Sequence, residues 1–415
     1  MNAEIITIGD ELLIGQVIDT NSAWLGQQLS TLGIKLHYKS SISDNKEAIL
    51  KALHDAERRS NIIIITGGLG PTKDDITKVT MCEYFNTHLI QNDKVLEWVQ
   101  HIFRFRKMPM LDVNNMQALV PANCEVLWNK NGTAPGMWFD IDDKIFISMP
   151  GVPFEMKTIF EEEAIPKIKN KFNLAAIYHR TLQTVSIGES YLAKKIEDIE
   201  DALPSHIKLA YLPSVGAVRL RFSAYGEDKT HLEKEVDVFV KQVHERISDH
   251  IYGEGDDSLT QTLGNLLKAR KQTIATAESC TGGYIAHQLT SVAGSSSYFM
   301  GSIVSYANYI KTQELGVSED ILKSKGAVSE ECVKQMANGV RQKMKTSFGI
   351  SCSGIAGPDG GSDEKPVGTV WIAIASENET IAQVFNFGDN RERTIQRTGL
   401  MAMDMLRKFI LKKEN

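Results

Sequence analysis

Apolar runs and amphipathic segments alternate along the first part of the chain. Residues 3–8 (AEIITI) and 61–66 (NIIIIT) predict strands. The second run is almost entirely β-branched, which is typical of a central parallel strand that is covered on both faces. Residues 22–32 and 46–60 carry leucine, isoleucine and alanine on one face and predict helices. Strands and helices in this order predict an α/β fold built from right-handed βαβ units.

Two polar loops that contain glycine follow the predicted strands. The first is Gly9-Asp10-Glu11, and the second covers residues 67–75 (GGLGPTKDD). Ligands of parallel sheets collect beyond the carboxyl ends of the strands, so both loops are expected at a ligand site. A further strand is predicted at 145–149 (IFISM). Asp44 stands three residues before Glu47, and we interpret this pair as a capping box for the helix at 46–60.

The pattern changes near residue 173, where a second domain is expected to begin. Two runs that alternate apolar and polar residues flank a predicted helix at about 191–203, and this order predicts a small α+β module that ends near Tyr252. Residues 253–257 (GEGDD) have the composition of a linker. Ser258 then caps a helix with Gln261 as its partner. The sequence therefore predicts three domains, which cover residues 1–171, 172–252 and 253–415.

A turn between a strand and a helix stands out in the third domain. Residues 273–277 (TIATA) predict a buried strand, and residues 284–290 (YIAHQLT) predict the helix that follows. The turn between them, residues 278–283 (ESCTGG), holds a carboxylate, a hydroxyl and a thiol. A serine at such a turn can be exposed while the helix amides behind it point toward an anion. The turn is therefore a candidate for nucleophilic chemistry, phosphate binding, or both.

Two further strands are predicted after this turn. The segment GSIVSY at 301–306 ends in Tyr306, and Lys311 lies just beyond it. The segment FGISCS at 348–353 runs into a glycine-rich loop at 353–361. Backbone amides in such a loop can cradle a phosphate or a sugar.

The composition limits the classes of partner. The chain has 415 residues, of which 42% are hydrophobic and 24% charged, which is ordinary for globular domains. A net charge of −6 and a pI of about 6.0 argue against a nucleic-acid backbone as the main partner. No apolar run approaches about 18 residues, so we expect neither a signal peptide nor a membrane span. Five scattered cysteines without a CxxC motif predict a reduced, cytoplasmic protein without disulfides or a zinc site.

The residues of the third domain suggest, but do not by themselves establish, a nucleophile. A catalytic serine needs a base and an anion-stabilising environment. The only histidine from residue 258 onward is His287, and it completes no Ser-His-Asp set. Lys311 is an alternative base if burial lowers its pKa. Cys280 is either an alternative nucleophile or a small buried residue. Helix capping and a solvated lysine are the commoner roles, so the residues alone indicate a phosphate-binding α/β domain.

Four carboxylates stand in the two N-terminal loops: Asp10, Glu11, Asp74 and Asp75. Clustered carboxylates beside glycine-rich loops suit a divalent cation that bridges a pyrophosphate. The alternative is that Asp74 and Asp75 cap the helix after their loop. The glycine spacing is not GxGxxG, so a dinucleotide dehydrogenase is weakly supported.

Residues from about 258 to 410 resemble the C-terminal domain of the CinA (competence/damage-inducible protein) family, an α/β amidohydrolase domain. The matching stretches are TAESCTGG, AGSSSYFMGSIVSYANYIK, GAVSE, SGIAGPDGGSDEKPVGTVW and FNFGDNRER. The resemblance implies hydrolysis of the carboxamide of nicotinamide mononucleotide, without a cofactor, to nicotinate mononucleotide and ammonia. It implies that Ser279 is the nucleophile and that Lys311 and Tyr306 are its activating partners.

The same resemblance implies a set of substrate contacts in this domain, namely Thr281, Gly282, Gly283, Gly357, Gly360, Gly361, Arg391 and Arg393. Turn amides would stabilise the oxyanion, and an arginine would hold the phosphate. Asn390 lengthens the Gly-Asp-Arg pattern of the family, so the choice between Arg391 and Arg393 stays open.

Residues 1 to about 170 resemble the molybdopterin-binding fold domain of the same family, a three-layer α/β domain. The motifs are GDELLIGQVIDTNS, GGLGPTKDD, NGTAPGM and PGVPFEM. The resemblance implies an ADP-ribose pyrophosphatase that yields AMP and ribose 5-phosphate with a divalent cation (magnesium, manganese or cobalt), and potassium is a further candidate ion. Metal and acid–base roles fall on Asp10, Glu11, Asp74 and Asp75. Substrate contacts fall on Gly68, Gly70, Thr72, Asn131, Gly132, Thr133 and Gly151.

The middle module resembles a type II KH-like domain in the order of its elements. KH domains that bind nucleic acid use a GxxG loop, and Gly188-Glu189-Ser190-Tyr191 breaks that pattern. We therefore expect a spacer or a dimer contact, and the resemblance implies a homodimer.

The resulting hypothesis is a bifunctional salvage hydrolase of pyridine nucleotides, with nicotinamide mononucleotide and ADP-ribose as its small-molecule partners. One alternative is a protein that binds or handles molybdopterin and has an inactive N-terminal domain. Another is an accessory to DNA uptake or damage response, which only the family name suggests.

Overall fold

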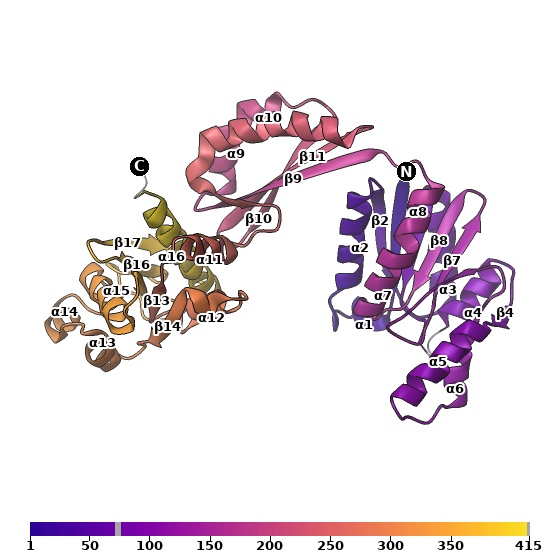
Figure 1. Ribbon diagram of the computed structural model, residues 1–415, viewed down its shortest axis with the longest axis horizontal. Coiled ribbons are helices and arrows are strands. Elements are labelled where there is room, and N and C mark those ends of the chain that lie inside the picture. The colour runs from indigo at the N-terminus through magenta and orange to yellow at the C-terminus, as the bar shows by residue number, and fades with distance from the viewer. Residues whose placement is uncertain (71–75, 413–415) are drawn as a thin grey trace. The chain divides into compact units, whose positions relative to one another are not determined.

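The computed structural model describes residues 1–70 and 76–412. The chain divides into two compact units, one of residues 1–178 with 225–232 and one of residues 179–224 with 233–415. Each unit combines sheets with helices, so the predicted α/β class is confirmed (Figure 1). Within the described residues, every helix is too short or too polar to cross a membrane.

The N-terminal domain contains a six-stranded sheet in the order β2-β1-β3-β8-β7-β6. Its strands are β1 (Asn2–Ile8), β2 (Lys35–Ile42), β3 (Ile62–Thr66), β6 (Glu125–Leu127), β7 (Gly136–Ile141) and β8 (Lys144–Met149). Strand β1 runs parallel to β2 and β3, and β3 runs parallel to β8. All residues of β3 are buried, as the β-branched run predicts.

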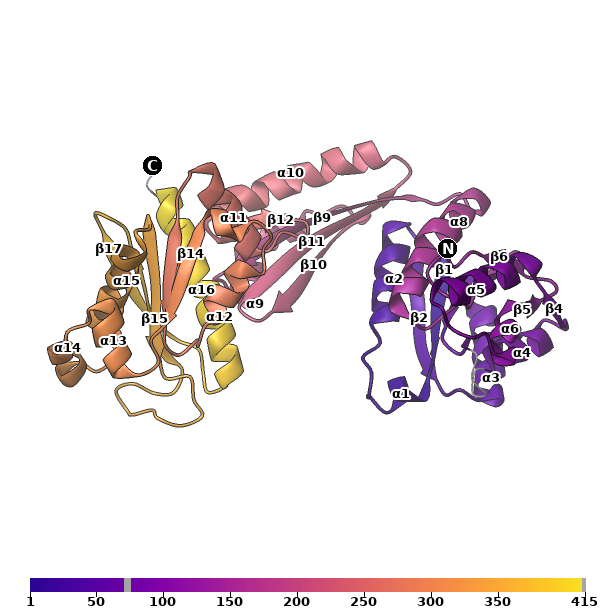
Figure 2. The ribbon, with the colours of Figure 1, turned by 60° about the horizontal axis from the view of Figure 1, so that its bottom comes forward.

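Helices cover both faces of this sheet and complete three layers (Figure 2). One face packs against α2 (Thr20–Thr31), α7 (Pro153–Ile159), a π-helical turn (Phe160–Ala164) and α8 (Ile165–Lys171). The other face packs against α3 (Lys46–Arg59) and α4 (Thr77–Tyr84). The remaining elements are α1 (Asp10–Leu13), α5 (Asp93–Phe105), α6 (Asp112–Asn115), a 3₁₀ turn (Met116–Ala118) and a small sheet of β4 (Leu89–Gln91) and β5 (Leu119–Pro121).

The predicted capping box on Asp44 is wrong. The residue that caps α3 is Asn45, whose side chain accepts a hydrogen bond of 2.9 Å from the Ala48 amide. Aspartate and asparagine cap helices equally well, so composition alone does not choose between neighbours. Asp44 instead lines a cavity.

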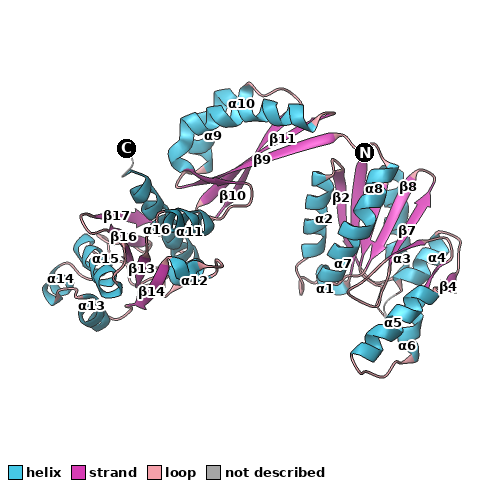
Figure 3. Cartoon of the chain, viewed as in Figure 1, coloured by secondary structure: helices cyan, strands magenta, loops and turns pink. Residues whose placement is uncertain are grey.

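The middle module is a four-stranded sheet with two main helices (Figure 3). The strands, in the order β10-β11-β9-β12, are β10 (Ile207–Ser214), β11 (Ala217–Gly226), β9 (Ala176–Val185) and β12 (Ile251–Glu254), and the helices are α9 (Glu189–Asp201) and α10 (Lys229–Ile247), followed by a 3₁₀ turn (Ser248–His250). Strand β12 pairs antiparallel with β9. The segment predicted as a linker, 253–257, therefore begins inside a strand, because Gly253 and Glu254 pair with Gln183 and Leu182.

The C-terminal domain has a five-stranded sheet with helices on both faces (Figure 2). The strands, in sheet order, are β14 (Phe299–Val304), β13 (Ile274–Glu278), β15 (Phe348–Gly354), β16 (Thr369–Ala375) and β17 (Thr380–Asn386). One face carries α11 (Leu259–Ala269), α12 (Tyr284–Thr290) and α16 (Arg391–Lys412), and the other carries α13 (Asn308–Leu315), α14 (Glu319–Ser324) and α15 (Glu330–Met344). A 3₁₀ turn (Ser295–Ser297) precedes β14.

Parallel pairing aligns the strand ends that carry the candidate chemistry. Strand β13 lies between β14 and β15, and both run parallel to it. Glu278, the last residue of β13, pairs with Val304 on one side and Cys352 on the other. The residues that follow β13 and β14 and those that end β15 therefore meet at one edge of the sheet.

Hydrogen bonds to a buried ion pair of α16 join the middle module to the C-terminal domain. Arg407 Nη2 lies 2.8 Å from Asp404 Oδ1, and the two residues are 5% and 1% exposed. Arg407 also donates to the carbonyls of Asp249 and Ile251 at 3.1 and 3.2 Å. The Ser186 hydroxyl donates to the Asp404 carboxylate at 2.6 Å. Because a buried ion must be paired and hydrogen-bonded, these contacts hold the end of the middle module in place.

Candidate active site

The Ser279 turn follows β13 at the aligned edge of the C-terminal sheet. Ser279 is 8% exposed, and its amide donates to the Cys352 carbonyl of β15 at 3.1 Å. The turn closes with a bond of 3.1 Å from the Gly282 amide to the Ser279 carbonyl. Gly282 and Gly283 have φ values of 59° and 100°, a region that glycine adopts readily. The backbone thus turns sharply into α12 immediately after the serine.

Lys311 lies directly against this serine. It stands in the first turn of α13 and is 1% exposed. Its Nζ is 3.1 Å from Ser279 Oγ, 2.6 Å from the Ser305 carbonyl and 3.2 Å from the Tyr306 carbonyl. The structure therefore brings together the predicted nucleophile and the predicted base.

The surroundings of Lys311 favour the neutral amine. Burial lowers the pKa of Lys311, and nearby thiols, first Cys332 and then Cys280, oppose that shift. Among the ion pairs of the described residues, none joins Lys311 to a carboxylate. A buried ammonium without a carboxylate partner is unfavourable, so the lysine can act as a base at a lower pH than a solvated lysine.

Ser279 and Lys311 open into a cavity of about 230 Å³. Its lining is Ser279, Cys280, Tyr306, Asn308, Lys311, Ala327, Val328, Ser353, Gly354, Ala356 and Arg391. The residues come from the ends of β13, β14 and β15, from α13, from the loop before α15 and from the start of α16. The site is thus assembled from segments far apart in the sequence.

Tyr306 contacts Lys311 through its carbonyl oxygen and not through its phenol. The phenol side chain is 62% exposed, and its oxygen accepts a hydrogen bond of 3.2 Å from Arg391 Nη2. Among the described residues, no hydrogen bond joins the phenol to Ser279 or Lys311. The role of Tyr306 as an activating partner stays a prediction.

The two candidate arginines differ in their positions. Arg391 lines the cavity, and its Nη1 donates to the Gly357 carbonyl at 2.8 Å. Arg393 is exposed, and its amide donates to the Asn390 side chain at 2.9 Å, so Asn390 caps the start of α16. The extra residue in the Gly-Asp-Asn-Arg segment therefore acts as a helix cap, and it is Arg391 that faces the cavity.

The predicted glycine contacts lie around this cavity but not in its lining. In the described chain, Gly357 contributes a carbonyl to Arg391, while Thr281, Gly282, Gly283, Gly360 and Gly361 are absent from the lining. Gly357 has a φ of 88°, and a Cβ there would lie 2.6 Å from Val367 Cγ1, so its backbone requires glycine. In the described chain, the loop therefore contacts Arg391 through the Gly357 carbonyl, and its glycines do not line the cavity.

Cys280 is poorly suited to be the nucleophile. A hydrogen bond with the Cys352 thiol and burial both raise the pKa of the Cys280 thiol. The thiolate is the reactive form, so this environment suppresses its reactivity. The geometry thus favours Ser279 over its neighbour.

Glu278 is the functional residue that the sequence interpretation passed over. Its buried carboxylate accepts hydrogen bonds from the amides of Gly283, Ile285 and Ala286. The amides at the start of α12 were expected to face a bound anion, and instead they are occupied by this side chain. Its position before Ser279 was the available signal, since acidic groups bind well at helix N-termini.

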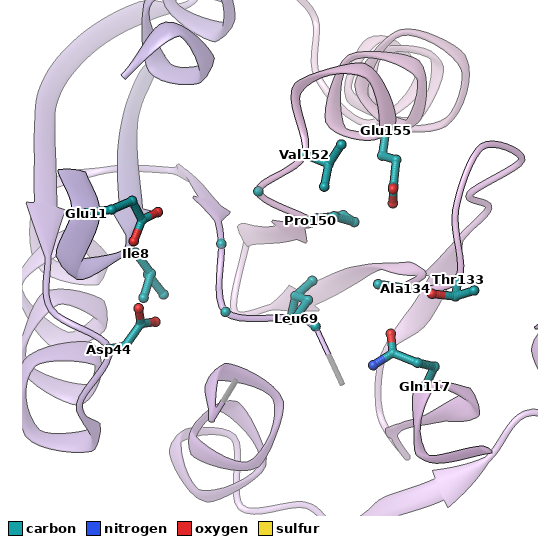
Figure 4. A pocket seen from close by; sticks show the side chains of 14 residues that line it. Ile8, Glu11, Asp44, Leu69, Gln117, Thr133, Ala134, Pro150, Val152 and Glu155 are labelled. Atoms are coloured by element: carbon teal, nitrogen blue, oxygen red, sulfur yellow. The ribbon is translucent and has the colours of Figure 1, made fainter. Parts of the chain in front are cut away.

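A second cavity, of about 420 Å³, lies in the N-terminal domain (Figure 4). Its lining includes Glu11, Gly68, Gly70, Thr133 and Gly151, as the sequence predicts. Figure 4 shows Glu11 and Asp44 on one side of the space, with Gln117, Thr133 and Glu155 on the other. These residues follow the carboxyl ends of β1, β2 and β8 or come from nearby loops, which agrees with the expected location at the sheet edge.

The remaining predicted residues that the structure describes do not line this cavity. Asp10 is exposed in the first turn of α1 and is not part of the lining. Asn131 and Gly132 lie outside this lining, and the Gly132 amide donates to the Asn129 side chain at 2.9 Å. Thr72, Asp74 and Asp75 lie outside the described residues.

Asp44, Gln117 and Glu155 were missed. The Asn129 amide donates to the Glu155 carboxylate at 2.7 Å, which fixes the orientation of that side chain. Asp44 had been interpreted as a helix cap, and Glu155 stood in the recognised PGVPFEM motif without a role. Gln117 lies in a 3₁₀ turn, and it belongs to none of the motifs that the sequence analysis singles out.

The donor chemistry of the N-terminal cavity suits a small divalent cation. Magnesium prefers carboxylate oxygens, and it commonly uses one or two of them together with water and substrate phosphates. Glu11 and Asp44 supply such a pair. In the chain as described, no cluster of three or more histidine, cysteine, aspartate or glutamate residues forms a metal cage.

Comparison with known proteins identifies each region of the chain. Residues 256–410 match the family described as "CinA C-terminal domain", residues 4–170 the "Probable molybdopterin binding domain" and residues 179–253 the "Damage-inducible protein CinA KH domain". A CinA-like protein of Cytophaga hutchinsonii is 51% identical over 406 residues, which cover 98% of this chain and 97% of the relative. A CinA-like protein of Flavobacterium psychrophilum is 50% identical over 414 residues, which cover 99% of each chain. A crystal structure of competence/damage inducible protein CihA from Agrobacterium tumefaciens is 38% identical, covers 36% of this chain and 92% of that one, and has a TM-score of 0.36.

The environment of Lys311 predicts a pH-dependent Ser279. The rate at which a fluorophosphonate labels Ser279 should rise with pH as Lys311 loses its proton, with a midpoint below 10.5, because burial lowers this pKa. Lys311→Met should lower the rate by about 10²–10⁴-fold and abolish the dependence, as expected for loss of a general base. Lys334→Met, at a partly exposed position of α15, is the control and should change neither the labelling rate nor its pH dependence. An unaltered pH profile in Lys311→Met would show that another group activates Ser279.

Proposed function

The chain belongs to the CinA family, and from this premise we propose that its C-terminal domain hydrolyses nicotinamide mononucleotide to nicotinate mononucleotide and ammonia. The observation that carries the proposal is the contact of 3.1 Å between Lys311 Nζ and Ser279 Oγ at a cavity of about 230 Å³. A buried serine and lysine suit acyl transfer, because the amine can take the hydroxyl proton without a histidine.

The contacts of Lys311 support its action as a base. A neutral amine has two N–H donors and one lone pair. Lys311 Nζ lies within hydrogen-bonding distance of both carbonyls and of Ser279 Oγ, so once deprotonated it can donate to the carbonyls of Ser305 and Tyr306 and accept from the Ser279 hydroxyl. In the proposed reaction Ser279 Oγ attacks the carboxamide carbon while its proton moves to Lys311. The carbon–nitrogen bond then breaks, and ammonia leaves with the proton from Lys311. Water hydrolyses the resulting ester by the reverse sequence and frees Ser279.

The turn also offers donors for the oxyanion of this reaction. In the described part of the chain, no oxygen accepts a hydrogen bond from the amides of Cys280 or Thr281. The amides of Gly283, Ile285 and Ala286 donate hydrogen bonds to the Glu278 carboxylate. We therefore assign oxyanion stabilisation to the amides of Cys280 and Thr281, a role in which two preorganised donors are effective.

Arg391 is the proposed partner of the substrate phosphate. It lines the cavity and stands at the first position of the 22-residue helix α16. A guanidinium can bind a phosphate through two hydrogen bonds, and the positive end of the helix dipole adds to the attraction. The substrate carboxamide would then lie at Ser279 while its phosphate lies at Arg391.

For the N-terminal domain we propose cation-dependent hydrolysis of ADP-ribose to AMP and ribose 5-phosphate. The cavity of about 420 Å³ at the sheet edge supports this proposal, since Glu11 and Asp44 can hold a divalent cation. When bound, such a cation would neutralise charge on the diphosphate oxygens. The amides of Gly68 and Gly70 would face the same group, and Glu155, oriented by Asn129, would orient a water molecule.

A molybdopterin-handling role is the second candidate for the N-terminal domain. The match of residues 4–170 to a family described as a molybdopterin binding domain favours it. Fluorescence of a pterin retained by the purified protein, together with no AMP from ADP-ribose, would support this alternative.

The nucleophile is tested by ammonia release from nicotinamide mononucleotide. Ser279→Ala should lower kcat by at least about 10³-fold, because it removes the attacking atom. Cys280→Ala should keep kcat within about tenfold, because the thiol is held protonated. Full activity in Ser279→Ala would refute the assignment, and loss of activity in Cys280→Ala alone would transfer the role to the thiol.

The phosphate site is tested by a matched pair of arginines. Arg391→Ala should raise KM for nicotinamide mononucleotide by about 10–100-fold, as expected for loss of a charge-assisted hydrogen bond. Its KM for nicotinamide riboside, which lacks the phosphate, should change little. Arg393→Ala, two residues along the same exposed helix end, should leave both KM values within about threefold. The reverse pattern would place the phosphate at Arg393.

The N-terminal activity is tested by AMP formation from ADP-ribose with magnesium, manganese or cobalt. Glu11→Gln should lower the rate by at least about 10²-fold and weaken metal binding, because it removes a carboxylate of the cavity. Asp10→Asn should have little effect, because Asp10 lies outside the lining. Wild-type protein that forms no AMP with any of the three metals would exclude the activity.

A further inference from the structure

Glu278 combines complete burial with a fully occupied carboxylate. It is 0% exposed at the end of β13 and directly precedes Ser279. Its Oε2 accepts hydrogen bonds from the Thr281 hydroxyl at 2.7 Å and from the amides of Ile285 and Gly283 at 3.0 and 3.1 Å. Its Oε1 accepts one from the Ala286 amide at 2.8 Å. The carboxylate therefore binds the turn at Thr281 and Gly283 and the first turn of α12 at Ile285 and Ala286.

Hydroxyl groups and amides balance the charge of this side chain. Longer contacts of 3.3 and 3.4 Å come from the hydroxyls of Thr276 and Ser302. Among the ion pairs of the described residues, none involves Glu278. The partial positive charge at the N-terminus of α12 thus stabilises the Glu278 carboxylate in place of a cationic side chain. The single Thr276 hydrogen is donated to Ser302 Oγ at 2.7 Å, and the other five contacts can come from donors, so an ionised carboxylate fits them better than an amide does.

The backbone of Glu278 holds the other half of the catalytic pair. Its carbonyl accepts a hydrogen bond of 2.8 Å from the Ser305 amide. The Ser305 carbonyl in turn lies 2.6 Å from Lys311 Nζ. Ser305 is fully buried, so this connection has little freedom to shift. One residue is therefore bonded to the turn that carries Ser279 and to the strand end that holds Lys311.

We infer that Glu278 is the positioning residue that sets the contact between Ser279 and Lys311. The inference rests on the proposed amidohydrolase function. The carboxylate fixes the turn that orients the Ser279 hydroxyl, and the carbonyl fixes the end of β14 beside Lys311. Misplacement of a reacting group by about 1 Å costs about 10²-fold in rate, so loss of this anchor should affect chemistry more than substrate binding.

The test compares two substitutions that each place an amide where a buried carboxylate stands. Glu278→Gln should lower kcat for nicotinamide mononucleotide by about 10²-fold and leave KM within about threefold. It should slow fluorophosphonate labelling of Ser279 by a similar factor. Asp404→Asn is the control, because Asp404 is 1% exposed and bonded to Ser186 and Arg407 away from the cavity. Asp404→Asn should unfold at a lower urea concentration than the wild type. It should change neither kcat nor the labelling rate of Ser279.

Each outcome separates the inference from the proposed function. A folded Glu278→Gln protein with wild-type labelling and kcat would overturn the inference. If wild-type protein is labelled at Ser279 but releases no ammonia, the proposed substrate is wrong, and slower labelling of Glu278→Gln still supports the positioning role. If Glu278→Gln does not fold, Thr281→Val replaces it, because this variant removes one donor to the carboxylate and leaves the charge. Labelling of Thr281→Val about tenfold slower than wild type would support the inference, and an unchanged rate would overturn it.

Discussion

The contact between the Ser279 hydroxyl and the buried Lys311 amine places the strictest demand on the C-terminal domain. An ammonium ion is costly to bury without a carboxylate, so its surroundings must favour the neutral amine and still satisfy its hydrogens. The carbonyls of Ser305 and Tyr306 satisfy them, and burial lowers the pKa. These groups can converge only because β14 and β15 run parallel to β13 and end beside it. The sheet topology is thus a condition of the contact between Ser279 and Lys311.

Local sequence signals placed the elements that they predicted close to the observed bounds, because hydrophobic periodicity depends on near neighbours. The β-branched run of β3 is buried throughout, and the helix predicted at 284–290 has those bounds in the structure. The sequence interpretation was wrong where residues far apart in the sequence determine the local structure. Residues 253–254 have a polar, linker-like composition, yet they pair with a strand that lies about 70 residues earlier in the chain. Nor could the sequence reveal that Glu278 occupies the amides of α12, or that the Tyr306 phenol lies against Arg391.

The two cavities use the same architectural location in different ways. Both lie at the carboxyl edge of parallel strands, where loops can vary without disturbing the core. The C-terminal cavity contains a buried amine and an arginine, a set suited to a nucleophile and an anionic substrate. The N-terminal cavity contains carboxylates and glycine amides, a set suited to a cation and a diphosphate. Recognition of motifs identified both locations, but Asp44 and Glu155 emerged only when the loops were seen together.

The ion pair of Asp404 and Arg407 bears on what counts as a domain in this protein. The boundary expected from composition lies at residue 253, yet Arg407 donates to carbonyls at 249 and 251, on the other side of that boundary. A chain cut there would discard two of the carbonyls to which the Arg407 guanidinium donates. The middle module thus supplies two hydrogen-bond acceptors to the Arg407 guanidinium of the neighbouring domain. The segment that composition marks as a domain therefore does not coincide with the set of residues that stabilise one another in the structure.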